Sequence, residues 1–181
     1  MSEIAARYRR LSGQFTDTVA AVPADRWDAP TPCEDWDARQ LVQHVVDSHG
    51  LFLGFIGEEL DVPPAADDPM AAWTTARDAV QSVLDDPQRA TKSFTGMFGE
   101  TTFEAGVDRF LSFDQVVHRW DLARATGQDE RIDDAEIAGL TEQASSFGDA
   151  MRGPGAFGPE LEAPSDADRQ AKLLAFLGRT P

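Results

Sequence analysis

Apolar residues recur at intervals of three and four positions along most of the chain, which is the spacing of one face of an α-helix. The clearest stripe lies near the start of the chain and comprises Ile4, Tyr8, Leu11, Phe15, Val19 and Val22. It predicts a first helix over residues 2–21. The same spacing predicts a second helix over residues 37–60 and a third over residues 69–85.

Capping signals support the starts of the second and third helices. Asp37 and Gln40 have the spacing of a capping box, in which each residue bonds to the backbone of the other. Asp68 is suited to cap the third helix, because Pro69 follows it at the first helical position. Both helices therefore begin at residues with a physical reason to start them.

Three further helical segments follow. A long helix is expected over residues 102–126, because Gly127 can close it in the left-handed conformation. A helical pattern also covers residues 131–152. The last segment is short, with Asp166 as its expected cap and Gly178 near its end.

The order of these segments predicts an all-α fold, an up-down four-helix bundle. Residues 87–101 contain Gly96 and Gly99 and are expected to be irregular, without a convincing sheet. Residues 153–181 are expected to be a short C-terminal extension packed on the bundle. We therefore expect a single domain over residues 1–181, a common length for one domain.

Charge and composition restrict the classes of partner. The chain has 16 Lys and Arg against 32 Asp and Glu, a net charge of −16 that repels nucleic acids and anionic membrane surfaces. Its apolar stretches are too short for a transmembrane helix, and its start lacks the apolar core of a signal peptide. The single Cys excludes an internal disulfide. A cytoplasmic protein is the simplest interpretation.

Two predicted helices carry polar residues on their expected inward faces. His44 lies in the apolar run LVQHVV, and Asp114 and His118 are four residues apart on one face of a later helix. A buried carboxylate costs several kcal/mol unless it is paired or binds a metal. These residues could hold zinc, nickel, iron(II) or manganese with open coordination positions. The alternative is a hydrogen-bonded core histidine and a local Asp–His pair.

Other residues with reactive side chains are weaker candidates. His49 is rotated away from His44 and is expected on the helix surface or rim. Cys33 is expected to be a small buried residue, although it could approach the site. Asp121 either orients His118 or points outward and pairs with Arg124. The FTGMF segment, residues 94–98, is a candidate pocket wall.

Two motifs resemble those of a known family. TPCEDWDARQLVQHVV (31–46) and FDQVVHRWDLARATG (113–127) resemble the DinB/YfiT-like superfamily. They are most similar to the metal-binding N-terminal domain of the mycothiol-dependent maleylpyruvate isomerase family of actinobacteria. The tail, with FGPELEAP (157–164) and LLAFLGRTP (173–181), resembles a stand-alone branch of that family.

The resemblance implies a four-helix bundle with a divalent metal held by His44, Asp114 and His118. Zinc is the first expectation for the metal and nickel the second. In the isomerases the carboxylate is usually Glu, so Asp114 has a shorter reach. The isomerases also carry a separate C-terminal domain, for which this chain leaves no room, so maleylpyruvate isomerisation itself is not expected.

Two functions remain open from the sequence. The first is a thiol-dependent transferase or isomerase, with mycothiol as cosubstrate and a small electrophile as substrate. The second is a non-catalytic metal-binding or stress-response module, in which the ion only stabilises the fold. The expected partners are small molecules, neither nucleic acid nor membrane. A homodimer is compatible with the sequence, which does not determine the oligomeric state.

Overall fold

A computed structural model describes residues 2–34, 36–96, 99–148, 152 and 157–181. The described chain is mostly helical and contains one small two-stranded sheet. The expected all-α class is therefore correct in its broad sense. The chain divides into two compact units, Met1–Glu130 and Arg131–Pro181, and each is considered by itself below.

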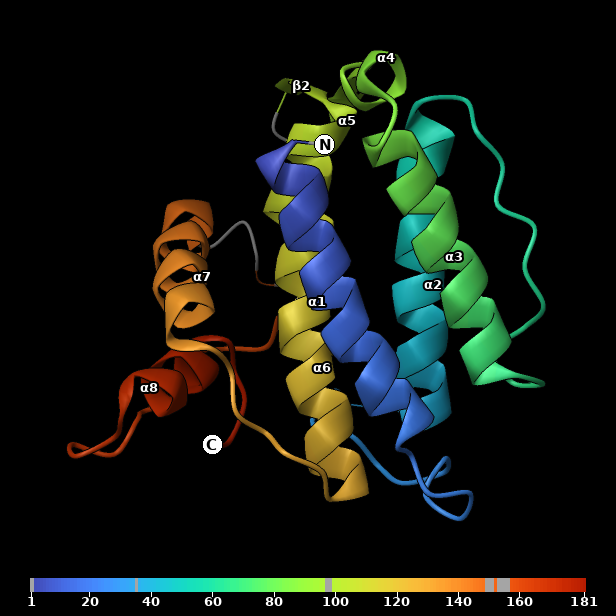
Figure 1. Cartoon of the computed structure of the whole chain (residues 1–181). Helices are drawn as coiled ribbons and strands as arrows, with labels where there is room; N and C mark the ends of the chain where they lie inside the picture. Colours follow the sequence, from blue (N-terminus) through green and yellow to red (C-terminus); the bar gives the residue numbers. More distant parts are fainter. Residues whose placement is uncertain (1, 35, 97–98, 149–151, 153–156) are drawn as a thin grey trace. The chain divides into compact units, whose positions relative to one another are not determined.

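Four long helices build the first unit: α1 (Glu3–Ala20), α2 (Ala38–Phe55), α3 (Pro69–Leu84) and α6 (Ser112–Thr126). α1 and α2 each pack against both α3 and α6 (Figure 1). Every one of these helices thus has two long neighbours, and the apolar core lies between them.

The capping residues act largely as the sequence predicts. The Ser2 hydroxyl accepts a hydrogen bond from the Ala5 amide, and Asp37 forms the complete capping box with Gln40. Asp68 caps α3 in the same way. The predicted end of the second helix was wrong, however: α2 stops at Phe55, and Gly57 turns the chain with φ +77°.

The predicted helix over residues 102–126 consists of three pieces. The first is α5 (Phe103–Gly106), the second is the π-helical turn η1 (Val107–Leu111), and the third is α6. Gly127 closes α6 in the left-handed conformation, with φ +76°. The π-helical turn holds more residues per turn than an α-helix, so it changes which face α6 presents. Such turns are frequent beside functional sites.

A β-hairpin occupies part of the segment that we expected to be irregular. β1 (Ser93–Gly96) and β2 (Gly99–Thr102) pair antiparallel and follow the short helix α4 (Pro87–Ala90). The expectation of no sheet was therefore wrong at this place, because Gly99 adopts φ +98° and lets the chain reverse. Residues 97 and 98 of the expected pocket wall lie outside the described residues.

Most of the apolar residues of α2 face the core. The buried ones include Leu41, Val42, Val45, Val46, Phe52 and Leu53. Leu51 and Phe55 are the exceptions, at 58% and 39% exposed. Because α2 carries apolar residues around much of its circumference, spacing alone does not identify its buried side.

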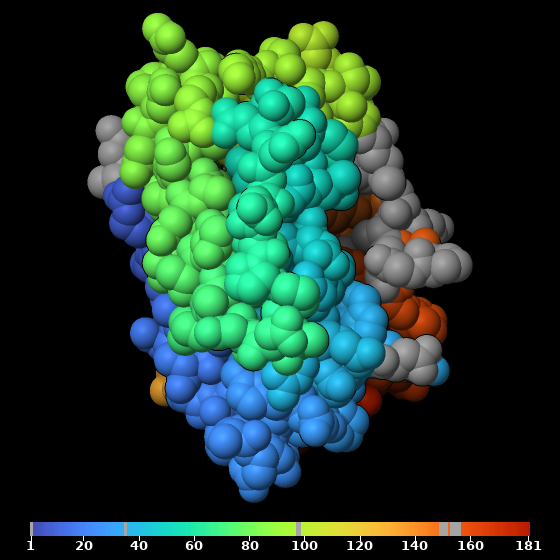
Figure 2. Space-filling view, turned by 90° about the vertical axis from the view of Figure 1, so that its right-hand side faces the viewer, coloured from blue at the N-terminus to red at the C-terminus, as the bar shows by residue number. Residues whose placement is uncertain are grey.

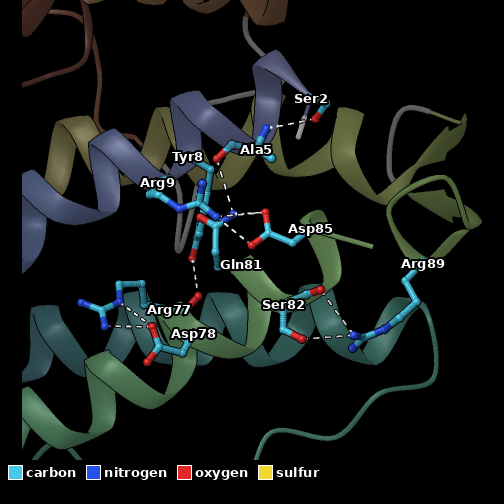
Figure 3. Close-up of polar contacts among 10 residues, drawn as sticks. All are labelled: Ser2, Ala5, Tyr8, Arg9, Arg77, Asp78, Gln81, Ser82, Asp85 and Arg89. Carbon is cyan, nitrogen blue, oxygen red and sulfur yellow. Dashed lines mark hydrogen bonds and ion pairs between the residues drawn. The ribbon is translucent and has the colours of Figure 1, made fainter. Parts of the chain in front are cut away.

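Polar contacts, one at the surface and one from the buried Tyr8, join α1 to α3 (Figure 3). Arg9 Nη2 lies 2.7 Å from Asp85 Oδ2, and the Tyr8 hydroxyl donates to the Arg77 carbonyl at 3.4 Å. The ion pair is exposed and contributes at most about 1 kcal/mol. These contacts align the two helices, while the buried side chains supply most of the stabilisation.

The segment between α2 and α3 is held against α2. The Gln43 side-chain oxygen accepts a hydrogen bond from the Ala65 amide at 2.7 Å, and Arg39 donates to the Ala66 carbonyl at 3.1 Å. Figure 2 shows this face, with α3 in green beside the connecting segment in teal. None of the described helices is both long and apolar enough to cross a membrane.

The second unit contains α7 (Asp134–Phe147) and α8 (Arg169–Phe176), which pack against each other. Gln170 accepts a hydrogen bond from the Ile132 amide at 2.8 Å and ties the start of the unit to α8. Asp168 caps α8, so the expectation that Asp166 caps it was wrong. The packing of residues 153–181 on the helices of the first unit stays a prediction.

Candidate metal centre

The structure brings the three predicted ligands together between α2 and α6. His118 Nε2 lies 3.1 Å from Asp114 Oδ1, and His44 Nε2 lies 3.5 Å from Asp114 Oδ2. One donor atom from each of the three residues falls within 4.8 Å of the other two. Two imidazoles and a carboxylate from facing helices therefore converge on one point.

The three ligands differ in their access to solvent. The side chain of His118 is 5% exposed, whereas those of Asp114 and His44 are 24% and 30% exposed. His44 and Asp114 thus lie at the edge of the core, on the side of α2 and α6 where the two helices face each other. Part of each of these two side chains is accessible to solvent.

Asp121 orients His118 from the buried side. Its carboxylate Oδ2 lies 3.0 Å from His118 Nδ1, and its side chain is fully buried. Arg124, the alternative partner, pairs with Glu130 at 2.7 Å instead. Because Nδ1–H donates to Asp121, Nε2 is the nitrogen that faces Asp114 and can bind a metal.

Asp114 and His118 stabilise each other as an ion pair. Burial would by itself raise the pKa of the Asp114 carboxyl and lower the pKa of the His118 imidazole. The attraction and hydrogen bonding between the two outweigh burial, with help from His44 on one side and Asp121 on the other. The pKa of Asp114 is therefore well below its usual value, and the pKa of His118 well above.

The loop before α2 contacts both imidazoles. The Cys33 thiol donates to Asp121 Oδ2 at 3.3 Å, and its sulfur lies 3.8 Å from His118 Nδ1. The Trp36 ring packs on the His44 ring, with 4.5 Å between centroids. The loop places a thiol and an indole directly beside the ligand cluster.

The sequence left two alternatives open for Cys33, a small buried residue or one that approaches the site, and the structure places its sulfur beside His118. The contact of Trp36 with His44 was not expected. The available signal was their position in the TPC-x-x-W segment just before the cap Asp37, since a loop at a helix start can fold back over the first turns. Cys33, His118 and Asp121 also form a second set of donor atoms within 4.8 Å, which shares His118 with the first set.

His49 is a core residue, so the expectation that it lies on the surface or rim was wrong. It is 1% exposed, and Nδ1 donates to the Val45 carbonyl at 2.7 Å. Nε2 lies 3.0 Å from the Tyr8 hydroxyl and 3.1 Å from the Gln115 amide nitrogen. Burial lowers the pKa of His49 to about 4, which keeps the ring neutral. It belongs to neither donor set.

The donor set suits a divalent ion of borderline softness. Imidazole nitrogen and carboxylate oxygen are common ligands of zinc, and imidazole also suits nickel. Among the described residues, no fourth His, Cys or carboxylate belongs to the set of His44, Asp114 and His118. A site with three protein ligands leaves positions for an exchangeable ligand.

The chain is similar to known proteins over most of its length. Residues 8–126 match the family described as the mycothiol maleylpyruvate isomerase N-terminal domain, and this range contains all three candidate ligands. The chain is 29% identical over 175 residues to the uncharacterised proteins Rv0738 and MT0763 of two Mycobacterium tuberculosis strains. The match covers 96% of each chain. No solved structure gives a significant match. The chain therefore belongs to the mycothiol maleylpyruvate isomerase N-terminal domain family.

Proposed function

We propose that the protein is a metal- and thiol-dependent transferase or isomerase that acts on a small electrophile, with zinc as first choice and nickel as second. The observation that carries the proposal is the convergence of His44, Asp114 and His118 at a partly exposed edge of the core. A site that only stabilised the fold would need no solvent-facing side.

The chemistry of the donor set favours an anionic partner. Two neutral imidazoles and one carboxylate would leave a divalent ion with a net charge of about +1. When bound, such an ion supplies a Lewis acid that stabilises the thiolate form of a small thiol. The family relationship makes mycothiol the first thiol to consider.

The chain's own residues hold and shield this site. Asp121 keeps the Nδ1 proton of His118 in place, so Nε2 stays available on the side of Asp114. Trp36 covers one face of His44 and keeps water from that side of the ring. The remaining open edge, beside Asp114, admits the thiol and the electrophile.

A fold, a cellular location and a class of partner go with the proposed function. We infer that α1, α2, α3 and α6 form the up-down four-helix bundle expected from the sequence. The protein acts in the cytoplasm on small molecules, with neither nucleic acid nor membrane as partner, since its charge of −16 opposes both.

Titration of the cobalt-substituted protein with mycothiol tests the proposal. A thiolate in the coordination sphere produces a sulfur-to-cobalt charge-transfer absorption, and the Cys33→Ala protein excludes a signal from the internal thiol. The band should appear and saturate in both proteins. If cobalt stays bound but millimolar mycothiol produces no band, the thiol-dependent function is wrong. The non-catalytic metal-binding or stress-response module then becomes the better account.

A further inference from the structure

An apolar surface lies on the solvent side of α2. It comprises Leu51, Phe55, Phe94 and Phe110 and is called the apolar strip below. Leu51 is 58% and Phe55 39% exposed, while Phe94 and Phe110 are partly exposed. The Phe55 and Phe94 rings are stacked, with centroids 4.8 Å apart and planes at 12°. Neighbouring exposed apolar side chains of this kind are typical of a surface that binds a ligand or partner.

The apolar strip continues from the candidate metal centre along one face of α2. His44, Ser48, Leu51 and Phe55 succeed one another at helical spacing. At about 1.5 Å per residue, Leu51 lies about 10 Å and Phe55 about 16 Å from His44 along the helix axis. One small molecule can thus contact both the apolar strip and the candidate metal-binding residues.

Residues of α6 and η1 lie opposite this face of α2 in the same order, from the metal centre to the apolar strip. Asp114 on α6 faces His44, and Phe110 on η1 lies beside Phe52 on α2, with ring centroids 6.2 Å apart. α2 packs against both α6 and η1. Polar donors at one end and aromatic rings at the other therefore line one continuous boundary between these elements.

Gly106 lets the backbone of α5 pack closely against the rings of Phe94 and Phe52. A Cβ atom at this position would lie 3.0 Å from Phe94 Cζ and 3.2 Å from Phe52 Cε1. The α5 backbone can approach both rings only because residue 106 has no side chain. Rings that are already fixed lose little conformational entropy when a ligand covers them.

We propose that the apolar strip binds an apolar or aromatic group of the substrate, about 10 Å from the reacting atom, while that atom lies at His44, Asp114 and His118. This inference rests on the proposed function and defines its substrate class as an elongated electrophile with an apolar tail. A protein partner fits the strip less well. A stable interface buries about 800 Å² on each partner, more than two strongly exposed apolar side chains provide.

The test compares two metal-binding probes on the zinc-loaded full chain. Acetohydroxamate carries only the metal-binding head, and 6-phenylhexanohydroxamate carries the same head and a phenyl ring on a flexible chain. Calorimetry should give about tenfold tighter binding for the phenyl probe. Leu51→Ala and Phe55→Ala should remove most of that gain and leave acetohydroxamate binding unchanged. The matched control Met70→Ala alters an apolar residue of α3 and should retain the gain.

The outcomes separate the apolar strip from the metal centre. Methyl resonances of Leu51 should shift with the phenyl probe and not with acetohydroxamate, and dichroism should show that all variants are folded. Equal affinity of the two probes, or a gain that survives in the Leu51→Ala/Phe55→Ala double variant, overturns the role of the strip while the metal centre stands. Failure to bind either zinc or nickel overturns the proposed function and this inference with it.

Discussion

Asp121 and His118 lie one turn apart on α6, and their side chains meet at 3.0 Å between Oδ2 and Nδ1. The carboxylate is fully buried, so it needs a partner, and the imidazole provides the N–H that it accepts. The contact decides which ring nitrogen faces Asp114. A residue outside the donor set thus determines how one of its members is presented.

Removal of either imidazole of the donor set should abolish tight metal binding. His44→Ala and His118→Ala should both fail to retain stoichiometric zinc after gel filtration, as measured by elemental analysis of protein without a His tag. His49→Gln is the matched control, because His49 belongs to neither donor set. It should retain zinc as the unmodified chain does. Full zinc content in both alanine variants would place the metal elsewhere.

Loss of the Asp121 carboxylate should weaken metal binding without removing a ligand. Asp121→Asn should lower zinc affinity by about 10- to 100-fold, because the His118 ring loses its fixed tautomer and orientation. Competition with a fluorescent chelator measures the affinity. Ring nitrogen chemical shifts of His118 in the zinc-loaded protein should report a change in tautomer or orientation, which a general loss of stability would not produce.

The matched control for that variant is Asp108→Asn. Asp108 pairs with Arg7 at 2.7 Å on a partly exposed surface, where an ion pair contributes little. Its zinc affinity and its His118 resonances should equal those of the unmodified chain. Equal behaviour of the two Asn variants would show that Asp121 does not position His118.

Two single substitutions distinguish the overlapping donor sets. If His44, Asp114 and His118 hold the metal, Cys33→Ala keeps stoichiometric zinc and Asp114→Ala loses it. If Cys33, His118 and Asp121 hold it, the two results are exchanged. Zinc content of the two purified variants decides between the sets, and their thermal unfolding shows whether each is folded.

Protonation of His49 should destabilise the fold in mild acid. Its pKa is about 4 in the folded chain, against about 6.5 in an unfolded one, so the unfolded state binds more protons between these values. This contribution to stability is fully present above pH 6.5 and is lost as the pH falls toward 4. It amounts to roughly 3 kcal/mol. Urea unfolding of the metal-free protein from pH 7 to pH 4 measures it.

The His49→Gln protein provides the comparison for that experiment. Every other titrating group is shared, so the difference in pH dependence between the two proteins reports His49 alone. The unfolding free energy of His49→Gln should fall less steeply between pH 6.5 and 4. Parallel curves for the two proteins would mean that His49 is not held neutral in the core.

Local signals in the sequence were sufficient for the starts of α2 and α3. Ser2, Asp37 and Asp68 cap helices through contacts that span only three residues, so their effect depends little on the rest of the fold. The pairing of Asp114 with His118 is equally local, because four residues on a helix bring two side chains together. The family could also be identified from the sequence, because each of its two motifs is one continuous segment.

The tertiary structure decided which side of each helix is buried. α2 has apolar residues on several faces, and packing against both α3 and α6 placed His49 in the core and left Leu51 exposed. The folded chain also shows which orientation Asp121 adopts, since it contacts His118 while Arg124 pairs with Glu130. The sequence identified His44, Asp114 and His118 as candidate ligands, whereas the second donor set, Cys33, His118 and Asp121, became apparent only in the folded chain. Their access to solvent and their supporting contacts depend on partners distant in sequence, and only the folded chain brings these together.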